Sequence, residues 1–207
     1  IIIITFLLII VPFWLFINKQ KSIGVAVKAT LGAFTTALLK IPKGILYGQN
    51  HTWTHLNKAG LAEVGLDDWL IHIAGNSQIK QVKNPGDVVQ KGELIAEMVS
   101  DKKVLHIYSP ISGNVALVNE NSINEITNDP YQKGWLYKIE PTNWDKETAN
   151  CFSGFYAKDW FDNEYVKFKD FLATSFSKYA LSPMPVLQEG GELRDNALDG
   201  LSEDIWN

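Results

Sequence analysis

The sequence predicts a mainly β domain that carries an N-terminal transmembrane helix and a C-terminal helical extension. Three observations predict this arrangement: an uncharged apolar run at the start, short alternating segments separated by turn residues in the middle, and aromatic residues at helical spacing after them. The length of 207 residues allows one domain of about 100 to 150 residues together with such appendages. We therefore expect five parts, with boundaries after residues 18, 46, 141 and 180.

Residues 1–18 form the predicted transmembrane helix. The run IIIITFLLIIVPFWLFI has no charged residue and ends at a polar segment that contains lysine. At about 1.5 Å per residue, this run is slightly shorter than the roughly 30 Å hydrocarbon core, and the chain does not begin with Met. The helix is therefore expected to extend upstream. A secretory signal peptide is the alternative, but no small-residue cleavage site follows the run.

Basic residues follow the apolar run without a compensating acid until Glu63. The lysines before that point are Lys19, Lys21, Lys28, Lys40, Lys43 and Lys58. Because lysine and arginine near a membrane helix favour the cytoplasmic side, we expect a single-pass protein of the cell inner membrane with the bulk of the chain in the cytoplasm. The first expected partner is thus the membrane bilayer.

Residues 19–46 are predicted to be an interfacial or partner-binding helical segment. Within it, residues 23–40 are small and apolar, with Lys28 and Lys40 as the only charges, which is too little polarity for a free surface helix. A second, short membrane-inserted helix is the competing interpretation. The sequence Ile41-Pro42-Lys43-Gly44 ends the predicted helix.

Residues 47–141 are predicted to form a small β-sandwich or β-barrel, because short strands alternate with turn signals. Asn57 to Gly60 supply a hairpin turn, and Asp67 is a natural N-cap for a short helix over 68–74 that Gly75 ends. The expected strands are 51–56, 61–66, 78–83, 93–99, 104–108, 114–119 and 135–140.

Five motifs in this region resemble a known family. They are His51-Thr52-Trp53, Val64-Gly65-Leu66, Pro85-Gly86-Asp87-x-Val89-x-Lys91-Gly92-Glu93, Ser109-Pro110-x-Ser112-Gly113-x-Val115 and Asp129-Pro130-Tyr131-x-x-Gly134-Trp135-Leu136. Their order and spacing are similar to those of the H protein of the glycine cleavage system. The resemblance implies an H-protein-like, lipoyl/biotinyl-type barrel-sandwich hybrid. The turn residues in these motifs have structural roles and reveal no chemistry by themselves.

The resemblance also implies a site. H proteins and lipoyl domains carry lipoate in amide linkage on a lysine at a hairpin tip, a short fixed distance before the Ser-Pro-x-Ser-Gly turn. Counting back from Ser109 places Lys102 at that position, which makes Lys102 the candidate lipoyl-lysine and Asp101 its neighbour at the tip. The implied cofactor is covalent lipoate.

Two features weaken this assignment. The H-protein hairpin usually reads Glu-Ser-Val-Lys-Ala, whereas Val99, Asp101 and Lys103 replace Glu, Val and Ala here. The lysine pair is also compatible with a solvated hairpin tip, because lysine commonly blunts exposed edges. Lys103 is no better a candidate, since a one-residue slip turns a side chain to the opposite face.

Several other function classes are not expected. Cys151 is the single cysteine, which excludes an internal disulfide and a Cys-rich metal site, and its setting indicates a half-buried apolar residue. His51 and His55 lie about 13 Å apart on a strand, too far to bind one metal ion. No block of basic residues suggests nucleic acid, and no catalytic arrangement stands out. We expect a carrier or accessory subunit rather than an independent catalyst.

The C-terminal third divides in two. Residues 142–180 are predicted to form an aromatic helical extension, whose aromatic side chains either complete the core or bind a partner. Residues 181–207 contain six acids against Arg194 and are expected to be an acidic tail that is poorly stabilised alone.

Two functions fit these features. The first is a membrane-anchored, H-protein-like lipoyl carrier that shuttles a lipoate-bound intermediate or electrons between partner enzymes at the cytoplasmic membrane face. The second is a non-lipoylated, non-catalytic docking or structural subunit of a membrane complex of respiratory type. Both predict other protein subunits as partners.

Overall fold

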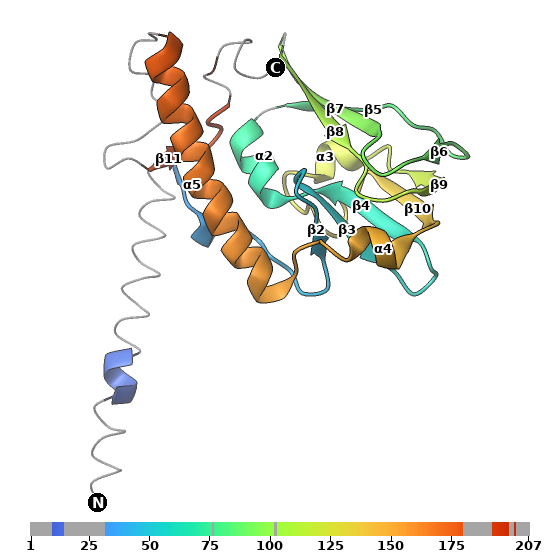
Figure 1. The fold of residues 1–207 in the computed structure, drawn as a ribbon, viewed down its shortest axis with the longest axis horizontal. Helices are drawn as coiled ribbons and strands as arrows, with labels where there is room; N and C mark the ends of the chain where they lie inside the picture. The colour runs from blue at the N-terminus through green and yellow to red at the C-terminus, as the bar shows by residue number, and fades with distance from the viewer. Residues whose placement is uncertain are drawn as a thin grey trace, which may run out of the picture.

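Two antiparallel sheets form the body of the molecule in the computed structural model (Figure 1). The structure describes residues 10–14, 32–75, 77–101, 103–179, 192–198 and 201, without the side chains of 123 and 176–179. The larger sheet has the order β2 (Leu46–Tyr47), β3 (Thr52–Leu56), β4 (Ala62–Leu66), β10 (Tyr137–Pro141), β9 (Gly113–Val118), β6 (Val88–Val89). The smaller sheet has the order β5 (Gln78–Gln81), β7 (Leu94–Ser100), β8 (Lys103–Tyr108). The mainly β prediction for the central region is thus confirmed.

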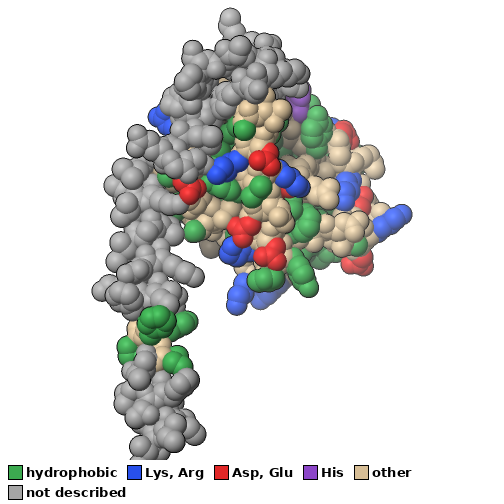
Figure 2. Space-filling model, turned by 60° about the vertical axis from the view of Figure 1, so that its left-hand side comes forward, with side chains coloured by type: hydrophobic (Ala, Val, Ile, Leu, Met, Phe, Trp, Pro, Cys, Tyr) green, Lys and Arg blue, Asp and Glu red, His purple; other side chains and the backbone are tan. Residues whose placement is uncertain are grey.

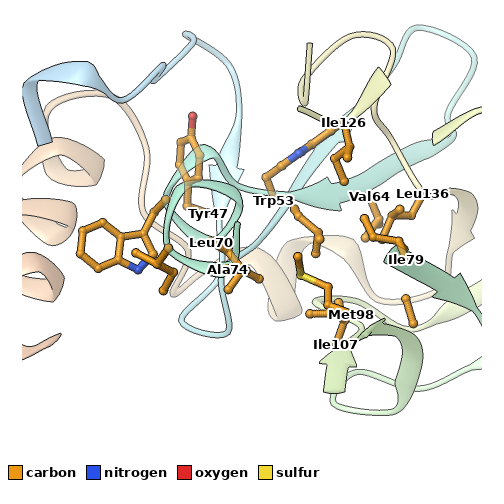
Figure 3. Packing of buried hydrophobic residues seen from close by; sticks show 14 of the residues in the cluster. Tyr47, Trp53, Val64, Leu70, Ala74, Ile79, Met98, Ile107, Ile126 and Leu136 are labelled. Atoms are coloured by element: carbon orange, nitrogen blue, oxygen red, sulfur yellow. The ribbon is translucent and has the colours of Figure 1, made fainter. Parts of the chain in front are cut away.

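The core lies between the two sheets. Figure 3 shows Val64 of β4 and Leu136, the residue before β10, on one side of the core. Met98 and Ile107 of the smaller sheet lie on the other side. The hydroxyl of Tyr137 joins the sheets directly: it donates to the carbonyl of Ile95 at 2.6 Å and accepts the N–H groups of residues 82 and 83. Because a buried phenol costs free energy unless it is hydrogen-bonded, this contact fixes how the sheets face each other.

Four helices complete the described domain: α2 (Asp68–Ala74), α3 (Ser122–Glu125), α4 (Trp144–Thr148) and α5 (Gly154–Tyr179). The predicted helix over 68–74 is confirmed at both ends. Asp67 accepts the N–H of Leu70 at 2.9 Å as N-cap, and Gly75 ends the helix at a φ of 65°. The sequence did not predict α3 or the two-residue strand β6, and the helical extension predicted over 142–180 is divided into α4 and α5.

Only part of the predicted transmembrane helix lies within the described residues. Residues 10–14 are helical, and their large apolar side chains are exposed. Within the ranges that the structure describes, no helix is both long enough and apolar enough to cross a membrane. The rest of residues 1–18, and residues 19–31, lie outside those ranges, so the transmembrane helix stays a prediction.

The helical prediction for residues 19–46 is wrong where the structure describes them. Instead of a helix, the chain forms β1 (Ala33–Phe34), the single 3₁₀ turn η1 (Thr36–Leu38) and the start of β2. Phe34 is completely buried and its ring lies 5.3 Å from that of Trp69. A strand conformation lets this side chain enter the core while the backbone pairs with another strand.

That other strand comes from the predicted acidic tail. β11 (Leu193–Arg194) pairs with β1, with Ala33 opposite Arg194 and Phe34 opposite Leu193. Leu193 and Leu201 are buried against the body. The expectation that residues 181–207 form a poorly stabilised tail is therefore wrong for 192–198 and 201, because apolar side chains between the acids pack against the body of the molecule. Residues 180–191, 199–200 and 202–207 lie outside the described residues.

The predicted aromatic helix is confirmed as α5, which runs along one side of the body (Figure 1). Phe161 is completely buried, and its ring packs edge-on against Tyr47. Tyr165 donates to the carboxylate of Glu192 at 2.7 Å and accepts the N–H of Leu193 at 3.3 Å. The helix thus completes the core and also holds β11 in place.

Replacing Gly65 by alanine should destabilise the fold by about 1–3 kcal/mol, because an added methyl group overpacks a filled core. A Cβ on Gly65 would lie 2.7 Å from the indole of Trp53, which is completely buried. Denaturant unfolding of G65A, W53F and the double variant measures the effect. The cost of G65A should shrink in the W53F background; an unchanged cost would show that the indole does not cause it.

Candidate functional site

The hairpin between β7 and β8 contains the predicted attachment site. Its strands pair from Leu94 opposite Tyr108 to Ser100 opposite Lys103, so Asp101 and Lys102 are the two connecting residues. Asp101 is exposed and has a φ of 52°. Two-residue hairpin turns require such a left-handed residue, and Asp accepts this conformation better than most. Lys102 itself lies outside the described residues.

The tip of this hairpin projects beyond its neighbouring strand. β5 pairs with β7 only up to Gln78 opposite Val99, so the pair of Ser100 and Lys103 extends past it. Figure 1 shows the β7–β8 hairpin rising to the top of the view, at the end of the body opposite the N-terminus of α5. The turn is therefore accessible to another macromolecule.

The outer surface of this small sheet is polar. Glu97 lies 3.5 Å from the ammonium of Lys80 and 3.9 Å from Nε2 of His106, and both of these partners are at least half exposed. Exposed pairs of this kind add little stability. The described residues contain no group of three side chains that could hold a metal ion. This polar surface keeps the outer face of the hairpin solvated.

The Ser-Pro-x-Ser-Gly motif anchors the base of the hairpin. Glu147 of α4 accepts the N–H of Ser112 at 2.6 Å and its hydroxyl at 2.7 Å. A Cβ on Gly113 would lie 2.1 Å from the carbonyl oxygen of Glu140, so only glycine allows this close approach. The predicted structural role of this motif is confirmed, and Glu147 is a contributor that the sequence did not indicate.

The His-Thr-Trp motif also has a structural role. His51 lies before β3 with a φ of 58°, so the prediction that it begins the strand is wrong. Its Nδ1 lies 2.9 Å from Oδ2 of the buried Asp67, and its ring stacks between Trp69 and Trp160. Burial raises the pKa of Asp67, while the charge and hydrogen bond of His51 oppose this shift. The pair of His51 and Asp67 thus connects the start of β3 with α2 and α5.

Cys151 lines a shallow cavity of about 370 Å³ near the base of the hairpin, beside Gly92 and Ser109. The thiol is partly buried, as the sequence predicted, and burial raises its pKa. A raised pKa disfavours the thiolate, which is the reactive form.

A second, larger cavity of about 610 Å³ lies beside α2 and is lined by Lys40, Asp68, His72 and Asp195. Nδ1 of His72 lies 2.7 Å from Asp195, and Nε2 lies 3.8 Å from Asp68. Burial lowers the pKa of His72, but the hydrogen bond to Asp195 and the two carboxylate charges outweigh it, so the pKa is raised overall. Lys40 opposes this shift. The sequence does not indicate this group of side chains, because Asp195 is remote from the others along the chain.

The sequence model of the family described as "Glycine cleavage H-protein" matches residues 45–158, more than half of the chain. The chain belongs to the glycine cleavage H-protein family. The match covers the hairpin, the Ser-Pro-x-Ser-Gly turn and the start of α5, whereas β1, η1 and β11 lie outside it.

Similar proteins carry the same description. A probable glycine cleavage system H protein of Pyrococcus furiosus is 35% identical over 111 residues, which cover 52% of this chain and 82% of that protein. The H protein of Streptomyces coelicolor is 31% identical over 105 residues, covering 49% and 84% respectively. The crystal structure of an H protein from Mycobacterium marinum matches with 30% identity and a TM-score of 0.45, covering 49% of this chain and 87% of that one.

The pair of His72 and Asp195 should make stability depend on pH. Because the pKa of His72 is raised above its ordinary value of 6.5, the folded state binds the proton more tightly than the unfolded state. This contribution is present below 6.5 and is lost as pH rises through the raised pKa. The free energy of unfolding should therefore fall between about pH 6 and about pH 8.

Urea unfolding at both pH values, compared between the parent chain and H72Q, isolates this contribution from other titrating groups. The fall should be smaller in H72Q, and D195N should reduce it as well because the hydrogen-bonded charge is removed. An equal fall in all three proteins would contradict the assignment to His72.

Proposed function

We propose that this chain is a lipoyl carrier with lipoate in amide linkage on Lys102, tethered to the inner membrane with its bulk in the cytoplasm. The observation that carries the proposal is the two-residue hairpin: Ser100 pairs with Lys103, which leaves Asp101 and Lys102 as the turn. Family membership supports a lipoyl carrier, since the similar proteins are named glycine cleavage system H proteins.

The residues at the tip fit an amide-linked arm. The β7–β8 ladder continues for one residue pair, Ser100 and Lys103, beyond the end of β5. A modifying ligase can therefore approach the turn from several sides. The replacement of the family's usual Val by Asp101 also has a physical reason, because a β-branched residue is strained at a φ of 52° and Asp is not. When bound, lipoate supplies a disulfide that takes up two electrons and two protons.

The rest of the chain holds this arm on a rigid base. β7 and β8 are paired from Ala96 to the tip, with a bulge between Leu94 and Ala96, and Glu147 fixes the turn that follows β8. The polar surface of Lys80, Glu97 and His106 keeps the strands solvated beside the arm. On this proposal the chain presents and carries a group, and partner enzymes perform the chemistry.

The membrane tether rests on the sequence. The apolar run of residues 1–17 is followed by six lysines and no acid before Glu63, which favours a cytoplasmic location for the carrier domain. A tethered carrier would serve enzymes that lie at or near the same membrane. Those partner subunits, and the intermediate or electrons that pass between them, are part of the proposal.

One observation favours the second function, a docking subunit without lipoate. Phe155 and Tyr156 are 73% and 75% exposed, so these two rings take little part in intramolecular packing and are available to a partner. Val99 also stands where the family usually has Glu at the hairpin. The two functions differ in one measurable property, which is the modification of Lys102.

Replacing Lys102 by arginine should abolish lipoylation completely, because the guanidinium cannot form the amide. Replacing the adjacent Lys103 by arginine is the matched control and should leave modification intact, since Lys103 is the first residue of β8 rather than of the turn. Intact-mass spectrometry of protein purified from its natural cells, together with an antibody against lipoyl-lysine, measures the outcome.

Parent chain that remains unmodified, in cells whose other lipoyl proteins are modified, would rule out the carrier and leave the docking subunit. Modification that persists in K102R and disappears in K103R would move the site by one residue and contradict the hairpin register.

A further inference from the structure

Exposed aromatic and lysine side chains gather at the end of the body opposite the β7–β8 hairpin. We call this set the basal patch: Lys43, Leu56, Lys58, Phe155 and Tyr156. Phe155 is 73% exposed, Tyr156 75% and Leu56 39%, and both lysines are exposed. Figure 2 shows hydrophobic and basic side chains together at the lower end of the body.

Backbone pairing brings these remote residues together. Tyr47 and Phe152 exchange two hydrogen bonds of 2.8 and 2.9 Å, which sets the start of α5 beside the segment that leads into β2. β2 in turn pairs with β3, and Nδ1 of His55 lies 3.0 Å from the carbonyl oxygen of Gly44. The loop at Lys43 therefore lies between the β3–β4 hairpin and the first turn of α5.

The two aromatic residues at the start of α5 are not used by the fold. Ala157, Trp160 and Phe161 of the same helix belong to the buried core, whereas Phe155 and Tyr156 contact each other at a ring distance of 6.3 Å. Large apolar groups that remain exposed in this way mark an interaction surface. The partner of this patch must accommodate aromatic rings and positive charge together.

The charges around the patch favour an anionic partner. Lys43 and Lys58 belong to the part of the chain before Glu63 that contains no acid. On α5 the acids nearest to the patch are the exposed Asp159, one helical turn after Phe155, and Asp162, which pairs with Lys158 at 2.6 Å. Aromatic rings flanked by lysines are typical of the headgroup region of a membrane, where the rings enter and the lysines meet anionic lipids.

The position of β1 allows this patch and a membrane tether to act together. The carbonyl oxygen of Phe34 lies 3.3 Å from the hydroxyl of Tyr165, which is ten residues after Phe155. At about 1.5 Å per residue, β1 therefore lies only about 15 Å along α5 from the patch. The 13 residues between 18 and 32 are enough to bridge that distance, since even at the 1.5 Å rise of a helix they would span about 20 Å.

We propose that the basal patch lies on the anionic cytoplasmic leaflet and orients the carrier domain, so that the β7–β8 hairpin points away from the bilayer. This inference rests on the proposed membrane tether. It turns a tethered domain into one with a preferred orientation, in which the attachment lysine faces enzymes in the cytoplasm.

The test uses the full chain reconstituted into vesicles of phosphatidylcholine with and without phosphatidylglycerol. In a C151S background, a single fluorophore is placed either at S153C, next to the patch, or at K80C on the outer face of the small sheet. Both positions are exposed. Lipids that carry a spin label at the headgroup should quench the S153C probe several-fold more than the K80C probe, and only when the anionic lipid is present.

Two variants separate the contributions within the patch. F155S/Y156S should lose most of the quenching at S153C, and K43Q/K58Q should remove its dependence on anionic lipid and on salt. Circular dichroism checks that each variant is folded, since all four side chains are exposed.

The outcomes distinguish this inference from the proposed function. A chain that washes off the vesicles at alkaline pH would overturn the tether and the orientation with it. A chain that is retained, but whose two probes are quenched equally, would overturn the orientation alone. Unquenched S153C together with a protein crosslinked at Phe155 in native membranes would assign the patch to a partner subunit instead.

Discussion

The carboxylate of Asp67 is buried at the point where the sheet, α2 and α5 meet. One of its oxygens accepts the N–H of Leu70 and so starts α2, while the other holds His51 in a left-handed conformation before β3. A buried carboxylate is costly unless its oxygens are satisfied, so these contacts stabilise one another. The ring of His51 then stacks on Trp160, which carries the constraint to α5. The strand register, the helix start and the position of the aromatic extension thus depend on a single group.

The segments outside the family match extend this arrangement. β1 and the segment that begins with β11 contact α2, and the hydroxyl of Tyr165 on α5 lies within hydrogen-bond distance of Phe34 in β1 and Leu193 in β11. Phe34 fills the space between Trp69 and Tyr165, at ring distances of 5.3 and 6.2 Å. The described additions therefore enlarge the core of the central domain on the side of α2, and they lie away from the β7–β8 hairpin.

Local signals made the central domain predictable. Alternating strands, the Asn57–Gly60 turn and the Asp67 cap depend on neighbours within a few residues, and the structure follows them closely. The hairpin that contains Asp101 was located by the family resemblance, through its distance from Ser109, and its strands reach one residue closer to the tip on each side than the sequence predicted. Contacts between remote segments were not predictable. Nothing near Phe34 indicates that it pairs with Leu193, and the small, apolar composition around it favours a helix when it is considered alone.

The pairing of β1 with β11 has a consequence for how the chain is made. Ala33 meets Arg194, so the two strands are separated by most of the sequence and close a very long loop. The ribosome makes the chain from the N-terminus, so Phe34 has no strand partner until Leu193 has been synthesised and released. The N-terminal and C-terminal segments therefore join last, and a chain cut short before residue 193 would keep the carrier sheets while leaving β1 unpaired.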